Sequence, residues 1–173
     1  MFIAAVTAMR SAQKAAGTPV QVRLLDIVSG LDSFVPEPTI RLIRDDGAWK
    51  KTWADHMYVP MTNGSNDFVA APAPPTIDFV KTMVLALFDG QAKAGSWRFL
   101  GAKPTKDGIT LRVQRVPLNS GMLEIAGSPY TFLLLTRSNA KIALEAFDGR
   151  EARQIADFPK IEPQPVPQRS AGN

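Results

Sequence analysis

The side chains that could break a bond or hold a metal ion are few and scattered. The chain has one histidine, His56, and no cysteine, so disulfides, thiolate metal sites and a cysteine nucleophile are excluded. A lone histidine is more often a surface or capping residue than a catalytic base, and we expect that role for His56. The carboxylates show neither metal-ligand spacing nor a catalytic or phosphate-binding motif. The sequence therefore predicts no catalytic residue, no metal site and no cofactor.

Asp78 has the most conspicuous position of the acidic residues, between Ile77 and Phe79 at the start of an apolar segment. We expect its carboxylate to accept backbone N–H groups at a turn. An uncharacterised hydrolase is the less favoured alternative. It would need a cleft that brings Asp78 close to a second carboxylate or to His56.

Trp49 and Trp53 are four residues apart, which places both on one face of a helix. Asp45 and Asp46 are suited to cap this helix, so a short helix is predicted over about residues 46–56. We expect the two tryptophans to pack on a sheet as core anchors. The alternative is a pair of exposed rings that stack on a sugar or a base. A carbohydrate- or cell-envelope-binding domain is therefore the second hypothesis for function.

The composition indicates a globular domain built from short strands and many turns. Of 173 residues, 45% are hydrophobic and 21% are charged, and the 14 prolines and 12 glycines favour turns over long helices. The net charge is +4, but the basic residues are scattered, so no nucleic-acid partner is predicted. No segment approaches the roughly 20 apolar residues of a transmembrane helix.

Alternating or fully apolar segments predict the strands that must position these side chains. The predicted strands cover residues 20–28, 40–42, 83–88, 97–99, 109–113, 131–136 and 141–147. Residues 29–33 are predicted to form a turn, and Asp107-Gly108 a hairpin turn. The expected fold is mainly β: one antiparallel sheet folded into a sandwich or half-open barrel, with the short helix packed on it.

The chain divides into a loosely ordered N-terminal segment (1–17), a single β-rich domain (18–158) and a Pro-rich extended or disordered tail (159–173). The predicted core consists of inward-facing apolar side chains. They are Val22, Leu24, Ile40, Leu42, Trp49, Trp53, Phe79, Val84, Leu85, Leu87, Trp97, Phe99, Leu111, Val113, Phe132, Leu134 and Ile142.

A second predicted hairpin carries the candidate binding residues. Asp89-Gly90 opens its turn and Gly95 closes it, between two strands that are predicted to be buried. The candidate contact residues are Gln91, Ala92, Lys93, Ala94, Gly95, Ser96 and Trp97. A hairpin fixed at its base presents its tip rigidly, which lowers the entropy cost of binding a partner. The plainer interpretation is that this segment only reverses the chain.

Three motifs occur in a fixed order over about residues 22–146. They are Trp49-x-x-x-Trp53-x-x-His56 after Arg44-Asp45, then Pro75-Thr76-Ile77-Asp78-Phe79 with Met83-Val84 and Phe88-x-Gly90, and finally Pro129-Tyr130 ahead of an apolar strand. In this order and spacing the chain resembles the protease complex subunit PrcB family, in its C-terminal-like domain. The family turn reads Gly-x-x-Pro-Thr-Gly-Gly-Tyr. Here Lys93-Ala94 replaces its Pro-Thr centre, Ser96 its second Gly and Trp97 its Tyr. The same turn is similar, by analogy, to the inhibitory loop of chagasin-type protease inhibitors.

The resemblance implies a secreted or envelope-associated accessory protein of a protease complex. Its partner would be a protein, such as a protease, and residues 91–97 would be the contact element. The apolar N-terminus lacks the basic region of a signal peptide, so the residues alone leave the localisation open. The leading hypothesis is a non-catalytic interaction module, a protease-complex accessory or inhibitor-like protein.

Overall fold

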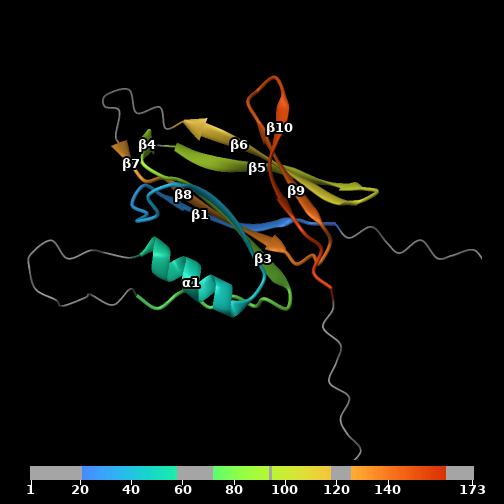
Figure 1. Ribbon diagram of the computed structural model, residues 1–173, viewed down its shortest axis with the longest axis horizontal. Coiled ribbons are helices and arrows are strands. Elements are labelled where there is room, and N and C mark those ends of the chain that lie inside the picture. Colours follow the sequence, from blue (N-terminus) through green and yellow to red (C-terminus); the bar gives the residue numbers. More distant parts are fainter. Residues whose placement is uncertain (1–20, 58–71, 94, 118–125, 163–173) are drawn as a thin grey trace, which may run out of the picture.

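The computed structural model describes residues 21–57, 72–93, 95–117 and 126–162. Its strands form two four-stranded sheets that pack face to face, and one helix covers the outer face of the first sheet (Figure 1). Among the described residues the sheets do not close into a barrel. The predicted mainly β sandwich with one short helix is confirmed.

The first sheet has the strand order β1-β8-β3-β2, and the second has the order β10-β9-β6-β5. The strands of the first sheet are β1 (Leu24–Gly30), β2 (Pro38–Ile43), β3 (Thr82–Asp89) and β8 (Tyr130–Thr136). Those of the second are β5 (Gly95–Thr105), β6 (Gly108–Pro117), β9 (Ile142–Phe147) and β10 (Ala152–Phe158). A separate short pair joins β4 (Ala92–Lys93) to β7 (Ala126–Gly127).

Among the described residues, every strand pair is antiparallel except β6 with β9. The expectation of a single folded antiparallel sheet was therefore wrong in this detail. The chain leaves β8 in the first sheet and crosses to the second, where β9 runs beside β6 in the same direction. Hairpins form the remaining pairs of the second sheet, β5 with β6 and β9 with β10. The hairpin predicted at Asp107-Gly108 is confirmed, since Thr105 pairs with Gly108.

Strand β3 is buried on both faces and separates two apolar clusters. Met83, Leu85 and Leu87 belong to the cluster between the sheets. Val84, Ala86 and Phe88 belong to the cluster under the helix. A strand covered on both faces has no polar side, which explains why this segment is continuously apolar in the sequence. All 17 predicted core residues are buried in, or packed against, one of the two clusters.

Helix α1 (Asp46–His56) has the predicted bounds. It begins after Asp45, whose Oδ1 accepts the Ala48 N–H at 2.8 Å, as expected of an N-cap residue. Its Trp49 packs edge-on against Phe132 of β8, with the ring centroids 5.3 Å apart. Aromatic contacts therefore hold one face of the helix to the sheet, whereas its exposed face is strongly polar.

Two segment predictions need correction. Strand β1 begins at Leu24 and continues through Ser29 and Gly30, which were expected in a turn. The ring of Tyr130 lies against Gly30 so closely that a Cβ there would be 2.6 Å from it, so a residue that looked like a turn former is a contact site for an aromatic ring. Strand β10 was not predicted, because a bulge between Gln154 and Ala156 interrupts its alternation.

The terminal predictions are mostly untested. Every described helix and strand lies between Leu24 and Phe158. The segment 1–17 and most of the tail, 163–173, lie outside the described residues, while 159–162 form no helix or strand.

Candidate functional site

The predicted hairpin over residues 91–97 does not exist as a hairpin. The strand before it, β3, belongs to the first sheet, and the strand after it, β5, belongs to the second. The segment therefore crosses from one sheet to the other, and its first part forms β4, which pairs with β7. Gly95, Ser96 and Trp97 are the first residues of β5. Ala94 and the side chain of Lys93 lie outside the described part of the chain.

The base of this crossover is fixed by a side-chain network around Asp89, the last residue of β3. Its Oδ1 accepts the Trp97 Nε1–H at 2.8 Å, and its Oδ2 accepts the Arg115 Nε–H at 2.9 Å. The Asp89 side chain is only 11% exposed. Charge-assisted hydrogen bonds in such a partly buried place are stronger than exposed ones. One carboxylate thus ties β3 of the first sheet to β5 and β6 of the second.

A further hydrogen bond joins the two sheets at the base of the crossover: the Trp97 backbone N–H donates to Thr131 Oγ1 of β8 at 3.1 Å. Gly90 makes the sharp exit from β3 with a φ of 65°. A Cβ at this position would be 2.8 Å from the Pro36 carbonyl oxygen, so the backbones of the two segments approach too closely for a side chain. Sequence reasoning missed Asp89 and Arg115. The available signal was a carboxylate placed directly after a wholly buried strand, where it requires a partner.

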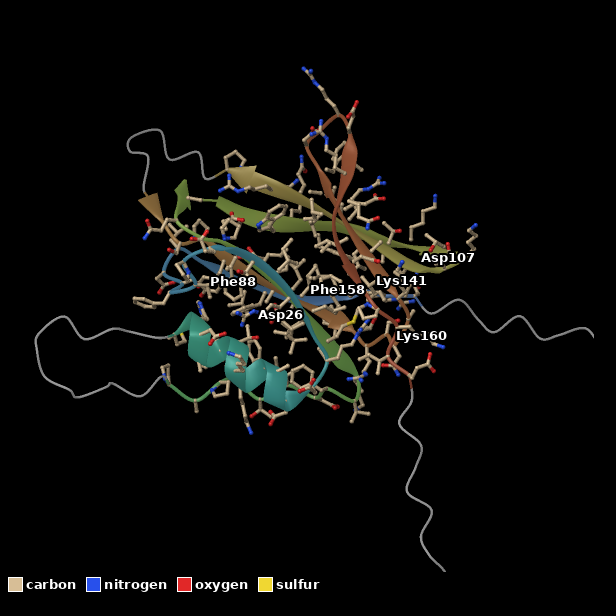
Figure 2. The ribbon with its side chains drawn as sticks, in the orientation of Figure 1. Asp26, Phe88, Asp107, Lys141, Phe158 and Lys160 are labelled. Carbon is tan, nitrogen blue, oxygen red and sulfur yellow. The ribbon has the colours of Figure 1, made fainter. Side chains whose placement is uncertain are left out.

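Several segments meet around β4 and β7, and we call this region the contact end. It comprises residues 31–35, 89–93, 95–97 and 126–129. Ser128 donates its N–H to the Leu31 carbonyl at 2.9 Å and accepts the Ser33 N–H at 3.1 Å. The Asp89 N–H donates to the Pro129 carbonyl at 3.0 Å. Gln91 is exposed, as are Asp32 and the aromatic ring of Phe34. The contact end lies at one end of the sandwich, and Asp107 in the β5–β6 turn lies at the other (Figures 1 and 2).

The two helix tryptophans are core anchors, as predicted. Trp49 is 2% exposed, and its indole N–H donates to the Pro75 carbonyl at 2.9 Å. Trp53 is partly buried and donates to the Pro72 carbonyl at 2.7 Å. The two rings contact each other and Phe132 rather than lying side by side in solvent. The buried ring of Trp49 is therefore not available to stack on a sugar.

His56 was expected at the surface or in a cap, and this prediction was wrong. It is 1% exposed. Its ring is enclosed by Trp53, Phe88, Tyr130 and Phe132, and the nearest ring centroid, that of Tyr130, is 4.2 Å away. Burial lowers the pKa of His56, and Asp32 opposes this with a smaller effect. The packing of β8 under α1 buries this residue. His56 follows Trp49 by seven residues and Trp53 by three, which places it on the same helical face, so the local spacing carried a signal that the sequence analysis did not use.

Asp78 performs the predicted turn role. Its Oδ1 accepts the Val80 N–H at 3.0 Å, and its backbone carbonyl accepts the N–H groups of Lys81 and Thr82. It lines an open hollow of about 620 Å³ together with Asp45 and Asp46. Each of these carboxylates has a local partner: Asp45 caps α1, Asp46 pairs with Lys50 and Asp78 pairs with Lys81. His56 does not line this hollow.

Further hollows lie on the described surface. One, of about 410 Å³, is on the outer face of the second sheet and contains the Arg112–Glu145 ion pair. Another, of about 370 Å³, lies between α1 and the segment before β2 and contains the Arg41–Asp55 ion pair. Each has a single acidic residue in its lining, so neither provides a pair of carboxylates for acid–base chemistry.

Among the residues that the structure describes, no three His, Asp or Glu side chains gather closely enough to hold a metal ion. No helix in this part of the chain has the length and apolar character needed to cross a membrane.

The geometry around residues 91–97 is that of a braced crossover beside a small two-stranded sheet. Comparison of the chain with protein-family models, with curated proteins and with solved structures gives no match. The resemblance to the PrcB family thus stays a prediction. The structure itself identifies the chain as a two-sheet β-sandwich with a helix on one outer face.

Proposed function

We propose that the protein is a non-catalytic interaction module that binds a protein partner through its contact end, as an accessory or inhibitor-like component of a protease complex. The observation that carries the proposal is the Asp89 network. Asp89 lies on β3 of the first sheet and binds Trp97 on β5 and Arg115 on β6 of the second, so the network fixes both ends of the segment that links the two sheets. A segment whose ends are fixed before binding loses less conformational entropy when a partner docks.

Other features of the contact end also favour a binding role. The β4–β7 pair and the Ser128 hydrogen bonds hold the neighbouring segments in place. Phe34 is 43% exposed, and exposed aromatic side chains are common anchors in protein interfaces. The resemblance to the PrcB family points to the same segment and supplies the class of partner.

The test is capture of partners from native extract by the tagged full-length protein, with quantitative mass spectrometry. We expect a protease or another component of its complex to be recovered in stoichiometric amount. Lys93→Glu should reduce this recovery by about tenfold, which corresponds to roughly 1.4 kcal/mol of binding free energy. The partner so found should then be titrated with the purified wild-type protein, and its protease activity followed.

The matched control is Lys106→Glu, which makes the same charge change in the β5–β6 turn, far from the contact end. Trp97→Ala is unsuitable as a contact variant, because Trp97 packs on the inter-sheet core and its loss would perturb the fold. Equal recovery with Lys93→Glu and wild type would refute this contact surface. Equal loss with both lysine variants would show a nonspecific effect of charge and count against it too.

A further inference from the structure

We propose that His56 is a proton-sensitive switch that links the docking of α1 to the order of the contact end. Its consequence for partner binding rests on the proposed function, but the switch itself is a property of the free protein. It would make the contact end well ordered near neutral pH and loosen it in acid.

The surroundings of His56 are suited to a neutral ring only. The side chain is 1% exposed, and its Nδ1 has no hydrogen-bond partner among the described residues. The enclosing groups are aromatic: Trp53 at 5.5 Å, Phe132 at 5.2 Å and Phe88 at 6.0 Å between ring centroids. Protonation would place a positive charge and an unsatisfied N–H in this enclosure, which is costly in an apolar site.

Few charged or titratable groups face the ring. Tyr130 on β8 contacts it at 4.2 Å, and its own pKa is raised by burial, so it is neutral in the relevant range. Asp32, before β2, is the acidic group that favours the imidazolium, but it is exposed to solvent. Asp55, the neighbour on α1, is engaged with Arg41 and Lys51. The aromatic faces favour a cation modestly, whereas burial disfavours it.

A continuous series of backbone hydrogen bonds joins His56 to the contact end. The His56 carbonyl accepts the Phe34 N–H at 3.0 Å. The adjacent Ser33 N–H donates to the Ser128 carbonyl at 3.1 Å. Residue 128 directly follows β7, which pairs with β4. A shift of the end of α1 would therefore act on the segment before β2 and, through Ser128, on the strand pair that carries residues 92 and 93.

The direction of the pH effect follows from the lowered pKa of His56. In the unfolded or undocked state the ring has its ordinary pKa of about 6.5, so below this pH that state binds more protons than the folded state. Docking is therefore most favourable above about pH 6.5 and weakens as the pH falls from there toward the folded-state pKa. Each unit between the two pKa values lowers the docking equilibrium constant about tenfold.

The experiment uses the single histidine of the chain, which gives one imidazole signal in NMR without assignment ambiguity. We expect this signal to titrate below pH 6.5 in the folded protein and near 6.5 in urea. The Ser33 and Ser128 amide signals should shift or broaden with the same midpoint as the imidazole. In His56→Phe, which keeps an aromatic ring in the enclosure, both amide signals should show no transition in this range.

The control for the link is the exposed Asp107, whose amide lies at the opposite end of the sandwich and should not follow the His56 midpoint. His56→Gln is a second variant should the phenylalanine variant fail to fold. An imidazole that titrates at or above pH 6.5, or Ser33 and Ser128 amides that ignore its midpoint, would overturn the proposal. Because no partner is needed, this result is independent of the Lys93→Glu capture test. Capture that depends on Lys93 but is equal at pH 7 and pH 5 would refute the effect of the switch on partner binding and leave the proposed contact end standing.

Discussion

At the residue scale, Asp89 has the most consequential contacts in the described part of the chain. It ends a strand of the first sheet, and both of its carboxylate oxygens accept hydrogen bonds from side chains of the second sheet. The Arg112–Glu145 pair has similar chemistry, but it lies on the outer face of the second sheet. The same kind of interaction should therefore contribute more at Asp89, where solvent screens it less.

Asp89→Asn should lower the free energy of unfolding by about 1.5–3 kcal/mol, because it removes the charge that two donors share while nearly keeping the side-chain shape. Urea unfolding followed by circular dichroism measures this change. Glu145→Gln is the control on the exposed pair and should cost less than about 1 kcal/mol. Similar losses for the two variants would contradict the special role of Asp89.

At the element scale, α1 depends on its first residues and on its aromatic face. The buried residues Trp49, Thr52 and His56 form the side of the helix that faces the sheet. Its outer side carries charged pairs such as Lys50 with Asp46, which are well exposed. A helix of 11 residues is too short to be stable alone, so capping and packing must both contribute to it.

Asp45→Ala should destabilise the protein by about 1 kcal/mol, because the Ala48 N–H loses its acceptor. Asp45→Asn is the matched control. Asparagine is an equally good N-cap residue, so the cost should be only a few tenths of a kcal/mol. Thermal or urea unfolding of the two variants provides the comparison. Equal losses of unfolding free energy would mean that the charge of Asp45 matters more than the hydrogen bond that it accepts as the N-cap.

At the scale of the whole molecule, two neighbouring arginines connect segments that are distant in the sequence. Arg44, at the junction of β2 and α1, is 7% exposed and donates to the carbonyls of Ala140 and Pro159. Arg137, after β8, donates to the carbonyls of Arg44 and Phe79. Burial and the nearby charge of Arg137 lower the pKa of Arg44, although arginine stays protonated. This pair attaches the start of the C-terminal tail to the helix-bearing sheet.

Arg44→Met should lower the free energy of unfolding by about 1–3 kcal/mol, because two carbonyls lose a donor that is held in a buried place. Relief of the repulsion from Arg137 would place the value toward the lower end of this range. The Ile161 amide, which donates to Asn139, should then exchange its hydrogen faster. Arg41→Met is the control. It breaks the partly exposed pair with Asp55, so it should cost no more than about 1 kcal/mol and leave Ile161 exchange unchanged.

The candidate site was only partly predictable from the sequence. Residues 91–97 were identified as a chain reversal from Asp89-Gly90, and a sharp turn is indeed present at Gly90. The same turn signal serves a hairpin and a crossover equally well, so it did not indicate that β5 lies in the other sheet. The partners of Asp89 come from Trp97 and Arg115 on that sheet, and the hydrogen-bonding need of Asp89 alone could not identify them.

The sequence by itself determined the elements that depend on near neighbours. Asp45 and the four-residue spacing of Trp49 and Trp53 were enough for the bounds of α1, and the alternation of Ile109, Leu111 and Val113 was enough for a buried strand face. The tertiary structure alone decided the rest, including the parallel pairing of β6 with β9 and the rings of Phe88, Tyr130 and Phe132 that enclose His56. Capping and side-chain periodicity act over a few residues, whereas strand order and burial arise from contacts between segments far apart in the chain. For this reason local patterns in the sequence predicted the core residues but not the side chains that surround His56.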